Sequence, residues 1–286
     1  MSGEALLQPL IAGLLTGMTY VLVALGLTVI FSIMNVLNFA HGEIYMFGAF
    51  CVYFLCTLLH LNYVLALPAA IVLVGVFGIA MERICFRPAQ GDMLTSVIVS
   101  IALIWLFQTA AQLIFGGEPR AMREFLPSTV SFLHIRISQS RLAAGLISLL
   151  LLVAVNFFVY RTKQGKAMQA VAQDRDAAAL QGIDLDRLGP LGFAIGCALA
   201  GAAGGIMAPI LYIDATMGGS VLGKSLAIIV LGGVGSIPGA AVGGLIVGVV
   251  ESYGQRFLGY PSSTFPFLIM IIILLFKRTG LMGRKA

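Results

Sequence analysis

Long apolar stretches alternate with short polar ones along this chain, and the apolar stretches exceed what the core of a soluble domain needs. Residues 5–40 contain no Asp, Glu, Lys or Arg. Because a helix of about 20 residues crosses the hydrocarbon layer of a bilayer, this run is longer than one crossing. The pattern predicts membrane-spanning helices, which we place at about residues 7–31, 44–59, 63–81, 94–115, 142–160 and 191–213.

The last third of the chain is apolar and rich in glycine, and it is interrupted once. Residues 225–250 contain the sequence GGVGSIPGA, in which Pro238 disfavours a continuous helix. We expect two half-helices that meet near residues 236–239 and enter and leave on the same face. A final span should run from near Phe257 to Phe276. The predicted fold is an all-α, polytopic transmembrane helical bundle of about eight segments, some broken or re-entrant, forming one domain over residues 1–286.

Two connections between the predicted spans have patterns of their own. Residues 82–92 form a short charged loop. Residues 132–138 alternate apolar with polar side chains, which is the two-residue period of a strand. We therefore expect a short strand in this connection, built from Leu133, Ile135 and Ile137 alternating with His134, Arg136 and Ser138.

The composition agrees with a membrane protein and argues against a nucleic-acid partner. The chain is 59% hydrophobic and 10% charged, whereas about 25% of the residues of a soluble domain are charged. The net charge of +5 comes from Lys and Arg at the ends of apolar spans, where membrane orientation explains them. The only charge before the first span is Glu4, so no cleavable signal peptide is expected. The four scattered cysteines are interpreted as apolar filler.

The distribution of positive charge predicts the orientation of the chain. With the N-terminus outside and the C-terminus in the cytoplasm, the cytoplasmic segments are residues 82–92, 161–190 and the tail from Lys277. These segments carry eleven of the seventeen Lys and Arg residues. The excess satisfies the positive-inside rule, provided that residues 225–250 do not cross the membrane once as a simple helix.

Residues 161–190 form the one long polar run between two long apolar blocks. Within it, residues 166–181 are rich in alanine and predict a single helix, with Gly182 as its stop. Asp184 is a plausible N-cap for the sixth span. The run is either a solvated connecting helix or a short helix that docks in a groove of a partner protein.

Polar residues near the second predicted span are the first candidates for a solute path. Asn35, Asn38, His41 and Glu43 interrupt an apolar region, and ionisable groups inside a membrane usually face an interior or an aqueous path. For His41 and Glu43 the alternative is a position at the cytoplasmic boundary. Apart from Glu43, we expect no acidic residue in the middle of a span.

The break near Pro238 supplies the second set of candidates. An interruption in mid-membrane exposes backbone amides and carbonyls that could face a permeating solute, here at Gly235, Ser236, Pro238 and Gly239. Other glycines recur at four-residue spacing, for example Gly192 with Gly196 and Gly244 with Gly248. This spacing favours close contact between helix backbones in lipid.

No motif for catalysis or metal binding emerges from the sequence. Residues 218–225, GGSVLGKS, match a phosphate-binding loop formally, but that loop needs a preceding strand and an acidic residue for magnesium. The three His residues lie far apart, and no Ser/His/Asp or paired-carboxylate arrangement is present. We therefore expect a protein that is not an enzyme and that has no catalytic or metal site.

Three segments together resemble the permease subunits of bacterial branched-chain amino acid ABC importers. They are residues 26–50, 165–184 and 226–244, and the likeness is closest to the shorter, H-type subunit. The related sugar permeases share the pattern less closely. The resemblance implies an inner-membrane complex with a second homologous permease subunit, two cytoplasmic ATPase subunits and a periplasmic solute-binding protein. ATP and magnesium would be bound by the ATPase subunits, so this chain needs no cofactor.

The resemblance also places the family's ATPase-coupling loop on residues 161–190. The loop lacks the Glu-Ala-Ala triplet for which such importer loops are named. Closure of the ATPases would push the helix at residues 166–181 and tilt the bundle. The positions that match the family's loop are Gly165, Ala170, Asp174, Ala177, Ala178 and Gly182.

Three alternatives remain open at this stage. An importer of this kind could carry urea, amides or another small solute. A stand-alone channel or secondary transporter would need no ATPase, although such transporters often carry acids in mid-span for ion coupling. A membrane scaffold or assembly factor would not need broken helices.

Overall fold

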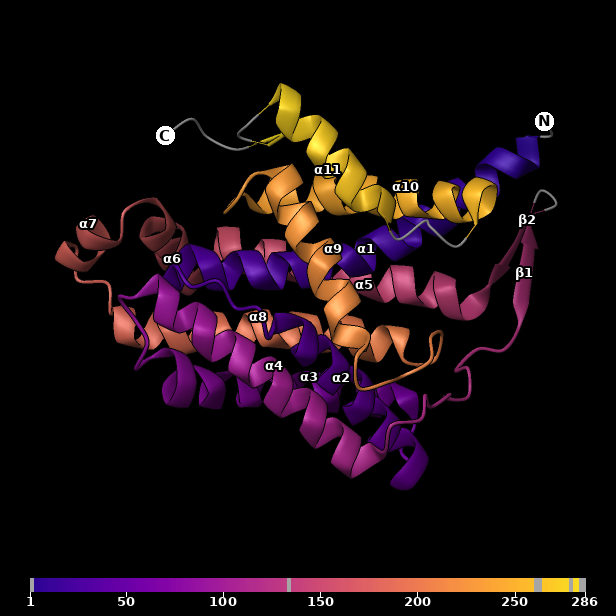
Figure 1. Ribbon diagram of the computed structural model, residues 1–286, viewed down its shortest axis with the longest axis horizontal. Coiled ribbons are helices and arrows are strands. Elements are labelled where there is room, and N and C mark those ends of the chain that lie inside the picture. The colour runs from indigo at the N-terminus through magenta and orange to yellow at the C-terminus, as the bar shows by residue number, and fades with distance from the viewer. Residues whose placement is uncertain (1–2, 133–134, 260–263, 278–279, 283–286) are drawn as a thin grey trace.

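A computed structural model describes residues 3–132, 135–259, 264–277 and 280–282. The described chain is a bundle of eleven α-helices with one small β-hairpin (Figure 1). Two π-helical turns, residues 54–58 and 82–86, extend α2 and α3. The elements are α1 (Gly3–Met34), α2 (His41–Tyr53), α3 (Tyr63–Met81), α4 (Met93–Phe115), β1 (Thr129–Phe132), β2 (Ile135–Ser138), α5 (Gln139–Arg161), α6 (Lys163–Gln173), α7 (Arg175–Leu180), α8 (Leu185–Met207), α9 (Met217–Gly232), α10 (Ile237–Leu258) and α11 (Phe265–Phe276).

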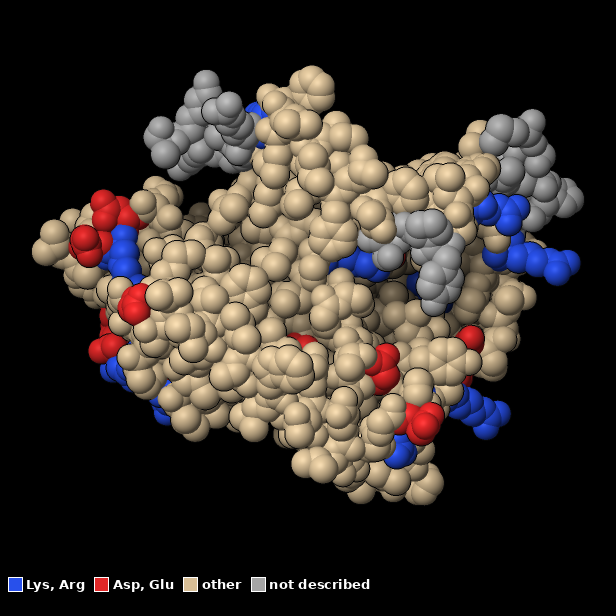
Figure 2. Space-filling model, viewed as in Figure 1, with Lys and Arg blue, Asp and Glu red and all other residues tan. Residues whose placement is uncertain are grey.

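Seven of the described helical segments are long and apolar enough to cross a membrane, judged by length and composition. They belong to α1, α2, α3, α4, α5, α8 and α10, and most lie along the long axis of the molecule, whereas α9 and α11 run obliquely across them (Figure 1). Charged side chains on the face in Figure 2 gather mainly toward the two ends, and few lie between them. The prediction of an all-α, polytopic bundle is confirmed.

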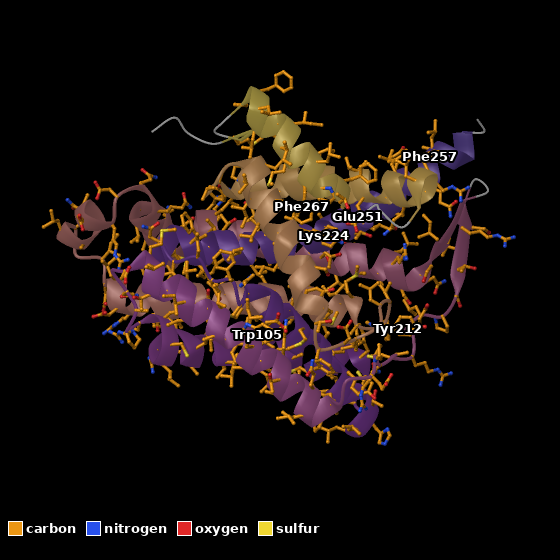
Figure 3. The ribbon with its side chains drawn as sticks, viewed as in Figure 1. Trp105, Tyr212, Lys224, Glu251, Phe257 and Phe267 are labelled. Atoms are coloured by element: carbon orange, nitrogen blue, oxygen red, sulfur yellow. The ribbon has the colours of Figure 1, made fainter. Side chains whose placement is uncertain are left out.

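Helices α1 and α8 form the centre of the bundle. Of the most apolar stretch of α8, 78% is buried, against 22% for the corresponding stretches of α4 and α5. Helix α1 contacts α10, α8 and α5, and α8 also contacts α2 and α3. Trp105 on α4 is 70% exposed on the outer surface (Figure 3). The apolar exteriors of α4 and α5 therefore suit a lipid environment.

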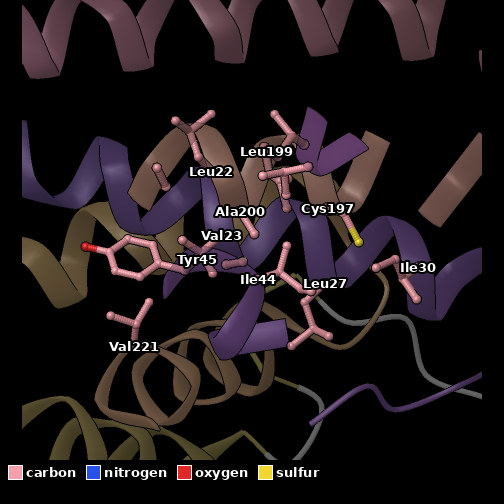
Figure 4. Close-up of a cluster of buried hydrophobic side chains, with 14 of the residues drawn as sticks. Leu22, Val23, Leu27, Ile30, Ile44, Tyr45, Cys197, Leu199, Ala200 and Val221 are labelled. Carbon is pink, nitrogen blue, oxygen red and sulfur yellow. The ribbon is translucent and has the colours of Figure 1, made fainter. Parts of the chain in front are cut away.

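Apolar side chains from four helices fill the centre (Figure 4). Leu22 and Leu27 of α1, Ile44 of α2 and Cys197 of α8 are each at most 1% exposed. Cys197 is a free thiol among these aliphatic groups, which matches its interpretation as apolar filler.

Glycines bring the helix backbones into direct contact, as their spacing predicts. A methyl group at Gly204 of α8 would overlap the carbonyl oxygen of Tyr45 on α2, and one at Gly196 would lie 2.7 Å from the carbonyl oxygen of Gly26 on α1. On the other side of α1, Gly244 and Gly248 of α10 have the same role. Small residues permit this proximity, and van der Waals contact holds the helices together in lipid.

Several helix boundaries differ from the sequence-based expectations. The helix expected at residues 166–181 is two helices, α6 and α7, because the backbone is extended at Asp174. The charged loop expected at residues 82–92 begins later, since the helix continues as a π-turn to Phe86. The last span is shorter than expected: α10 continues to Leu258 and stops at Gly259, whose φ is +75°, and the 12-residue α11 begins at Phe265.

The expected strand is present as β2, which pairs antiparallel with β1. Thr129 lies opposite Ser138 in this register, and Val130 lies opposite Ile137. Leu133 and His134, which the alternation placed in the strand, lie outside the described residues. The hairpin stands at the end of the bundle opposite α6 and α7 (Figure 1).

The contact between α2 and α8 gives a stability prediction. Gly204→Ala should lower the unfolding free energy by about 1–3 kcal/mol, because overpacking forces backbones apart. Thermal unfolding in detergent would measure the change. Gly219→Ala is the matched control, since nothing lies within 4 Å of its added methyl group. Equal midpoints for the two variants would contradict the importance of this contact.

Candidate functional site

Helix α2 begins deep inside the bundle rather than at its end. After α1 ends at Met34, residues 35–40 lead back to His41, whose Nε2 lies 3.2 Å from the carbonyl oxygen of Val23. Val23 is eleven residues before the end of α1, a distance of roughly 16 Å along a helix. This is about half of the roughly 30 Å hydrocarbon layer. His41 and Glu43 therefore lie in the interior of the protein, and their place in a solute path stays a prediction.

The start of α9 meets the start of α2 at this depth. Gly42 and Gly218 pack backbone to backbone, and a methyl group at Gly218 would lie 2.6 Å from the carbonyl oxygen of Gly42 and 2.9 Å from Glu43 Oε2. Each helix N-terminus carries a partial positive charge, although the His41, Glu43, Met217 and Gly219 amides already donate to backbone carbonyl oxygens. Two such ends converge beside a buried carboxyl group, so the environment there is strongly polar.

Asn38, His41 and Glu43, which we call the central cluster, are each at most 1% exposed. Glu43 Oε1 accepts a hydrogen bond from Gln108 Nε2 of α4 at 2.9 Å. Four other buried side-chain atoms of the central cluster have no hydrogen-bond partner among the described residues: Asn38 Oδ1, Asn38 Nδ2, His41 Nδ1 and Glu43 Oε2. A buried unpaired polar group costs about 1–3 kcal/mol. The central cluster therefore lowers the stability of the fold when its free polar atoms have no partner, and these atoms can bind water or a polar solute.

Asn35 lies apart from the central cluster. It is exposed just beyond the end of α1, with a φ of +54°, and its amide donates to the carbonyl oxygen of Phe31 at 2.8 Å. Asn tolerates this left-handed conformation better than most residues. Its position is explained by helix termination, and a contact with solute stays a prediction.

The break around Pro238 lies near the end of α1, not beside the central cluster. A Cβ atom at Gly235 would lie 3.7 Å from Ser32 Oγ, close to the last turn of α1. Ser236 Oγ accepts a hydrogen bond from the Gly239 amide at 3.1 Å, and Pro238 occupies the first turn of α10. This is an ordinary helix start. Two helices do meet at this break, because α9 ends at Gly232 and α10 begins at Ile237. The expectation of a half-helix is wrong for α10, whose 22 residues are enough to cross a membrane. A role of these residues in the solute path stays a prediction.

A buried ion pair was not predicted from the sequence. Lys224 Nζ of α9 donates to Glu251 Oε1 of α10 at 2.6 Å and to Tyr20 Oη of α1 at 3.0 Å (Figure 3). Glu251 is 6% exposed, so the expectation that Glu43 is the only mid-span acid is wrong. The sequence does indicate these two residues, because Lys224 and Glu251 are charges inside apolar helices, where a charge is costly and usually functional. Lys224 lies within α9, which is not the loop that phosphate binding requires.

The loop that the resemblance identifies as the coupling loop projects from one end of the bundle as α6 and α7 (Figure 1). Asp174 caps α7 by accepting from the Ala177 amide at 2.9 Å, and Gly182 follows the helix with a φ of +81°. Gly165 and Ala178 are buried, Ala170 is half-buried, and Ala177 and Gly182 are exposed. Met168 and Val171 attach α6 to the hydrophobic core. The loop thus has an anchored inner side and a free outer side.

Comparison with known proteins identifies relatives along nearly the whole chain. Residues 10–276 match the family described as branched-chain amino acid transport system, permease component. The chain is 33% identical to the high-affinity branched-chain amino acid permease protein BraD of Pseudomonas aeruginosa, over 97% of this chain and 96% of BraD. It is 30% identical to LivH of Escherichia coli K12 over the same shares.

A more distant relative carries a different solute name. The fructose import permease protein FrcC of Rhizobium meliloti is 28% identical over 62% of this chain and 52% of its own length. No solved structure matches the chain. The family match over residues 10–276 confirms the resemblance seen in three sequence segments. This chain belongs to the family of permease components of branched-chain amino acid transport systems.

Proposed function

We propose that this chain is a permease subunit of an ATP-driven importer that moves branched-chain amino acids across a bacterial inner membrane. The observation that carries the proposal is the likeness to BraD and LivH along 97% of the chain. The buried central cluster supports it, since a transported solute needs polar partners inside the membrane. The chain would supply half of the pore and a second homologous permease the other half.

The proposed complex also contains two cytoplasmic ATPase subunits, which bind ATP and magnesium, and a periplasmic solute-binding protein. The exposed outer side of α6 and α7 supports ATPase docking, because Leu180 is 87% exposed there. The charged connection at residues 82–92 lies at the same end of the bundle as α6 and α7, because its Arg87 pairs with Asp186 at the start of α8 at 2.7 Å. These segments are rich in Lys and Arg, which supports a cytoplasmic location for this end, with the N-terminus outside and the C-terminus in the cytoplasm.

In this mechanism the force of ATPase closure reaches the central cluster through α8. Helix α6 packs against α5, α1 and α8, so a push on α6 also displaces α8. Asp184 caps α8 by accepting from the Arg187 amide at 3.2 Å, which fixes α8 at the end of the coupling loop. Helix α8 in turn contacts α2 through Gly204 and Tyr45. A tilt of α8 therefore moves the start of α2, where the cluster lies.

A stand-alone secondary transporter is a second candidate, favoured by the buried acids Glu43 and Glu251. Intramembrane acids often couple transport to ions. Uptake of leucine by this chain alone in liposomes, driven by an ion gradient, would establish this alternative and exclude the importer. Urea, amides and sugars are further solute classes that the same uptake assay separates.

The coupling loop gives the first functional prediction. Asp174→Ala removes the cap of α7, and such a loss costs about 0.5–2 kcal/mol, enough to change a coupled rate about tenfold. Gly182→Val strains a backbone with a φ of +81°. In the purified complex, both variants should lose solute-stimulated ATPase activity and keep docking of the solute-binding protein. Asp92→Ala, which removes the cap of α4, is the matched control. Unchanged stimulation in both loop variants would contradict the coupling role.

The central cluster gives the second functional prediction. Asn38→Leu replaces an unpartnered buried amide by an apolar group of similar size, so it should leave the thermal midpoint equal or higher. If Asn38 contacts the solute, amino acid uptake should nevertheless fall about tenfold, which is the loss of one hydrogen bond of about 1.4 kcal/mol. Asn156→Leu on the exposed surface of α5 is the control. Higher stability with unaltered uptake would exclude Asn38 from the solute path.

A further inference from the structure

A cavity lies toward the end of the bundle opposite α6 and α7. Residues from α1, α5, α8, the segment after α8 and α10 surround about 100 Å³ of free space. A single water needs about 10–15 Å³, so a small organic molecule fits. None of the residues of the central cluster lines it. Figure 2 shows the surface hollowed to the right of centre, below α10, with blue side chains beside the hollow.

One wall of the cavity presents a buried carboxylate. Glu251 lines it, together with Tyr20. Glu251 Oε1 is engaged by Lys224 at 2.6 Å, whereas Oε2 has no hydrogen-bond partner among the described residues. Lys224 also lies 5.0 Å from the centre of the Tyr20 ring. These contacts fix the carboxylate in place, and its second oxygen can accept a hydrogen bond from an ammonium group.

The opposite charge comes from the start of α5. Arg141 lines the same cavity and is exposed, and no ion pair joins it to a carboxylate within the described parts of the chain. A guanidinium presents a fork of donors that matches a carboxylate. Helices α10 and α5 therefore bring an acceptor for an ammonium and a donor set for a carboxylate to one space.

The remaining lining is largely aliphatic. Ala12 and Leu15 of α1, Ala144 of α5, and Ile210 and Leu211 after α8 line the cavity. Burial of a small apolar side chain against such a wall stabilises a complex, because it removes apolar surface from water. A solute that fits all three walls has an ammonium, a carboxylate and a short aliphatic side chain.

We propose that this cavity is a transit site for the zwitterion of an aliphatic α-amino acid on its way from the solute-binding protein to the central cluster. The proposal rests on the proposed function and adds the residues that hold the solute. Glu251 accepts from the ammonium, Arg141 donates to the carboxylate, and the wall around Leu15 receives the side chain. The affinity of the site for its solute is expected to be low, because a transit site has to release the solute.

Protection from thiol labelling tests the site without any transport step. Thr16 lines the cavity, so Thr16→Cys, in a chain whose native cysteines are replaced by Ala, provides a reporter. In nanodiscs with the partner permease, leucine should slow maleimide labelling about fivefold at about four times its dissociation constant. Leucinamide, which lacks the carboxylate, and 4-methylpentanoate, which lacks the ammonium, should protect much less. Ser131→Cys on β1 is the control and should be insensitive to leucine.

Variants of the two charged walls should abolish this protection. Arg141→Gln alters an exposed side chain, and Arg136→Gln on β2 is its matched control at the same end of the bundle. Glu251→Gln alone leaves the Lys224 ammonium uncompensated, so the double variant Lys224→Met/Glu251→Gln accompanies it. Equal protection by leucine and by its two analogues, or protection that survives both Arg141→Gln and the double variant, would overturn the proposal.

Uptake by the complete complex separates this inference from the proposed function. Ala12→Leu narrows the cavity and should lower the ratio of leucine to alanine uptake about tenfold, the effect of about 1.4 kcal/mol of lost apolar contact. Ala102→Leu on the exposed surface of α4 is the control. Absence of any amino acid uptake by the wild type would refute the proposed function, whereas leucine protection tests the cavity independently. Normal uptake without leucine protection would refute the cavity alone.

Discussion

Direct contact between helix backbones at the centre of the bundle is the constraint on which the rest of the structure depends. Where α8 crosses α1 and α2, glycines leave no room for a side chain, and carbonyl oxygens lie against α-carbons. In lipid this van der Waals contact replaces the hydrophobic effect as the force between helices. It also holds α2 in position although its first residue lies in mid-bundle, where no loop at the end of the bundle can fix it.

The position of α2 explains why polar groups can persist in so apolar a chain. Residues 36–40 lead from the end of α1 into the interior, and irregular backbone inside a membrane is tolerated only when protein surrounds it. Val36, Asn38 and Ala40 are buried, and the helix α2 that follows packs against α1, α8 and α9. The same enclosure withholds partners from Asn38 and Glu43, so those side chains keep unused hydrogen-bonding capacity. Lys224 and Glu251 satisfy each other more fully and leave one carboxylate oxygen free.

Much of the architecture followed from the sequence, because lipid imposes one dominant pattern. The third and fourth spans were predicted within a residue, at 63–81 and 94–115, since uninterrupted apolar runs end at charges or caps. Local chemistry also predicted the stop at Gly182 and the cap at Asp184. The break at Asp174 was missed because the alanine-rich residues around it favour a helix, and a single N-cap in mid-run competes only weakly with that preference.

The candidate site was only partly predictable, because depth and pairing are tertiary properties. Asn38, His41 and Glu43 were recognised as unusual, but only the fold shows that the chain turns back and places them in the interior. The contact between Gln108 and Glu43 joins residues 65 positions apart, and that between Lys224 and Tyr20 joins residues 204 apart. No periodicity within one helix carries this information.

The glycines along α8 have a consequence for motion. Gly192 and Gly196 face α1, while Gly201, Gly204 and Gly205 face α2 and α3. Side chains of the neighbouring helices, such as Ile33 of α1 and Val74 of α3, occupy the space that these glycines leave. Side-chain ridges that insert into grooves resist sliding of one helix past another. A displacement of α8 therefore has to carry α1, α2 and α3 with it, so the residues that bring the backbones into contact make these helices move as one unit.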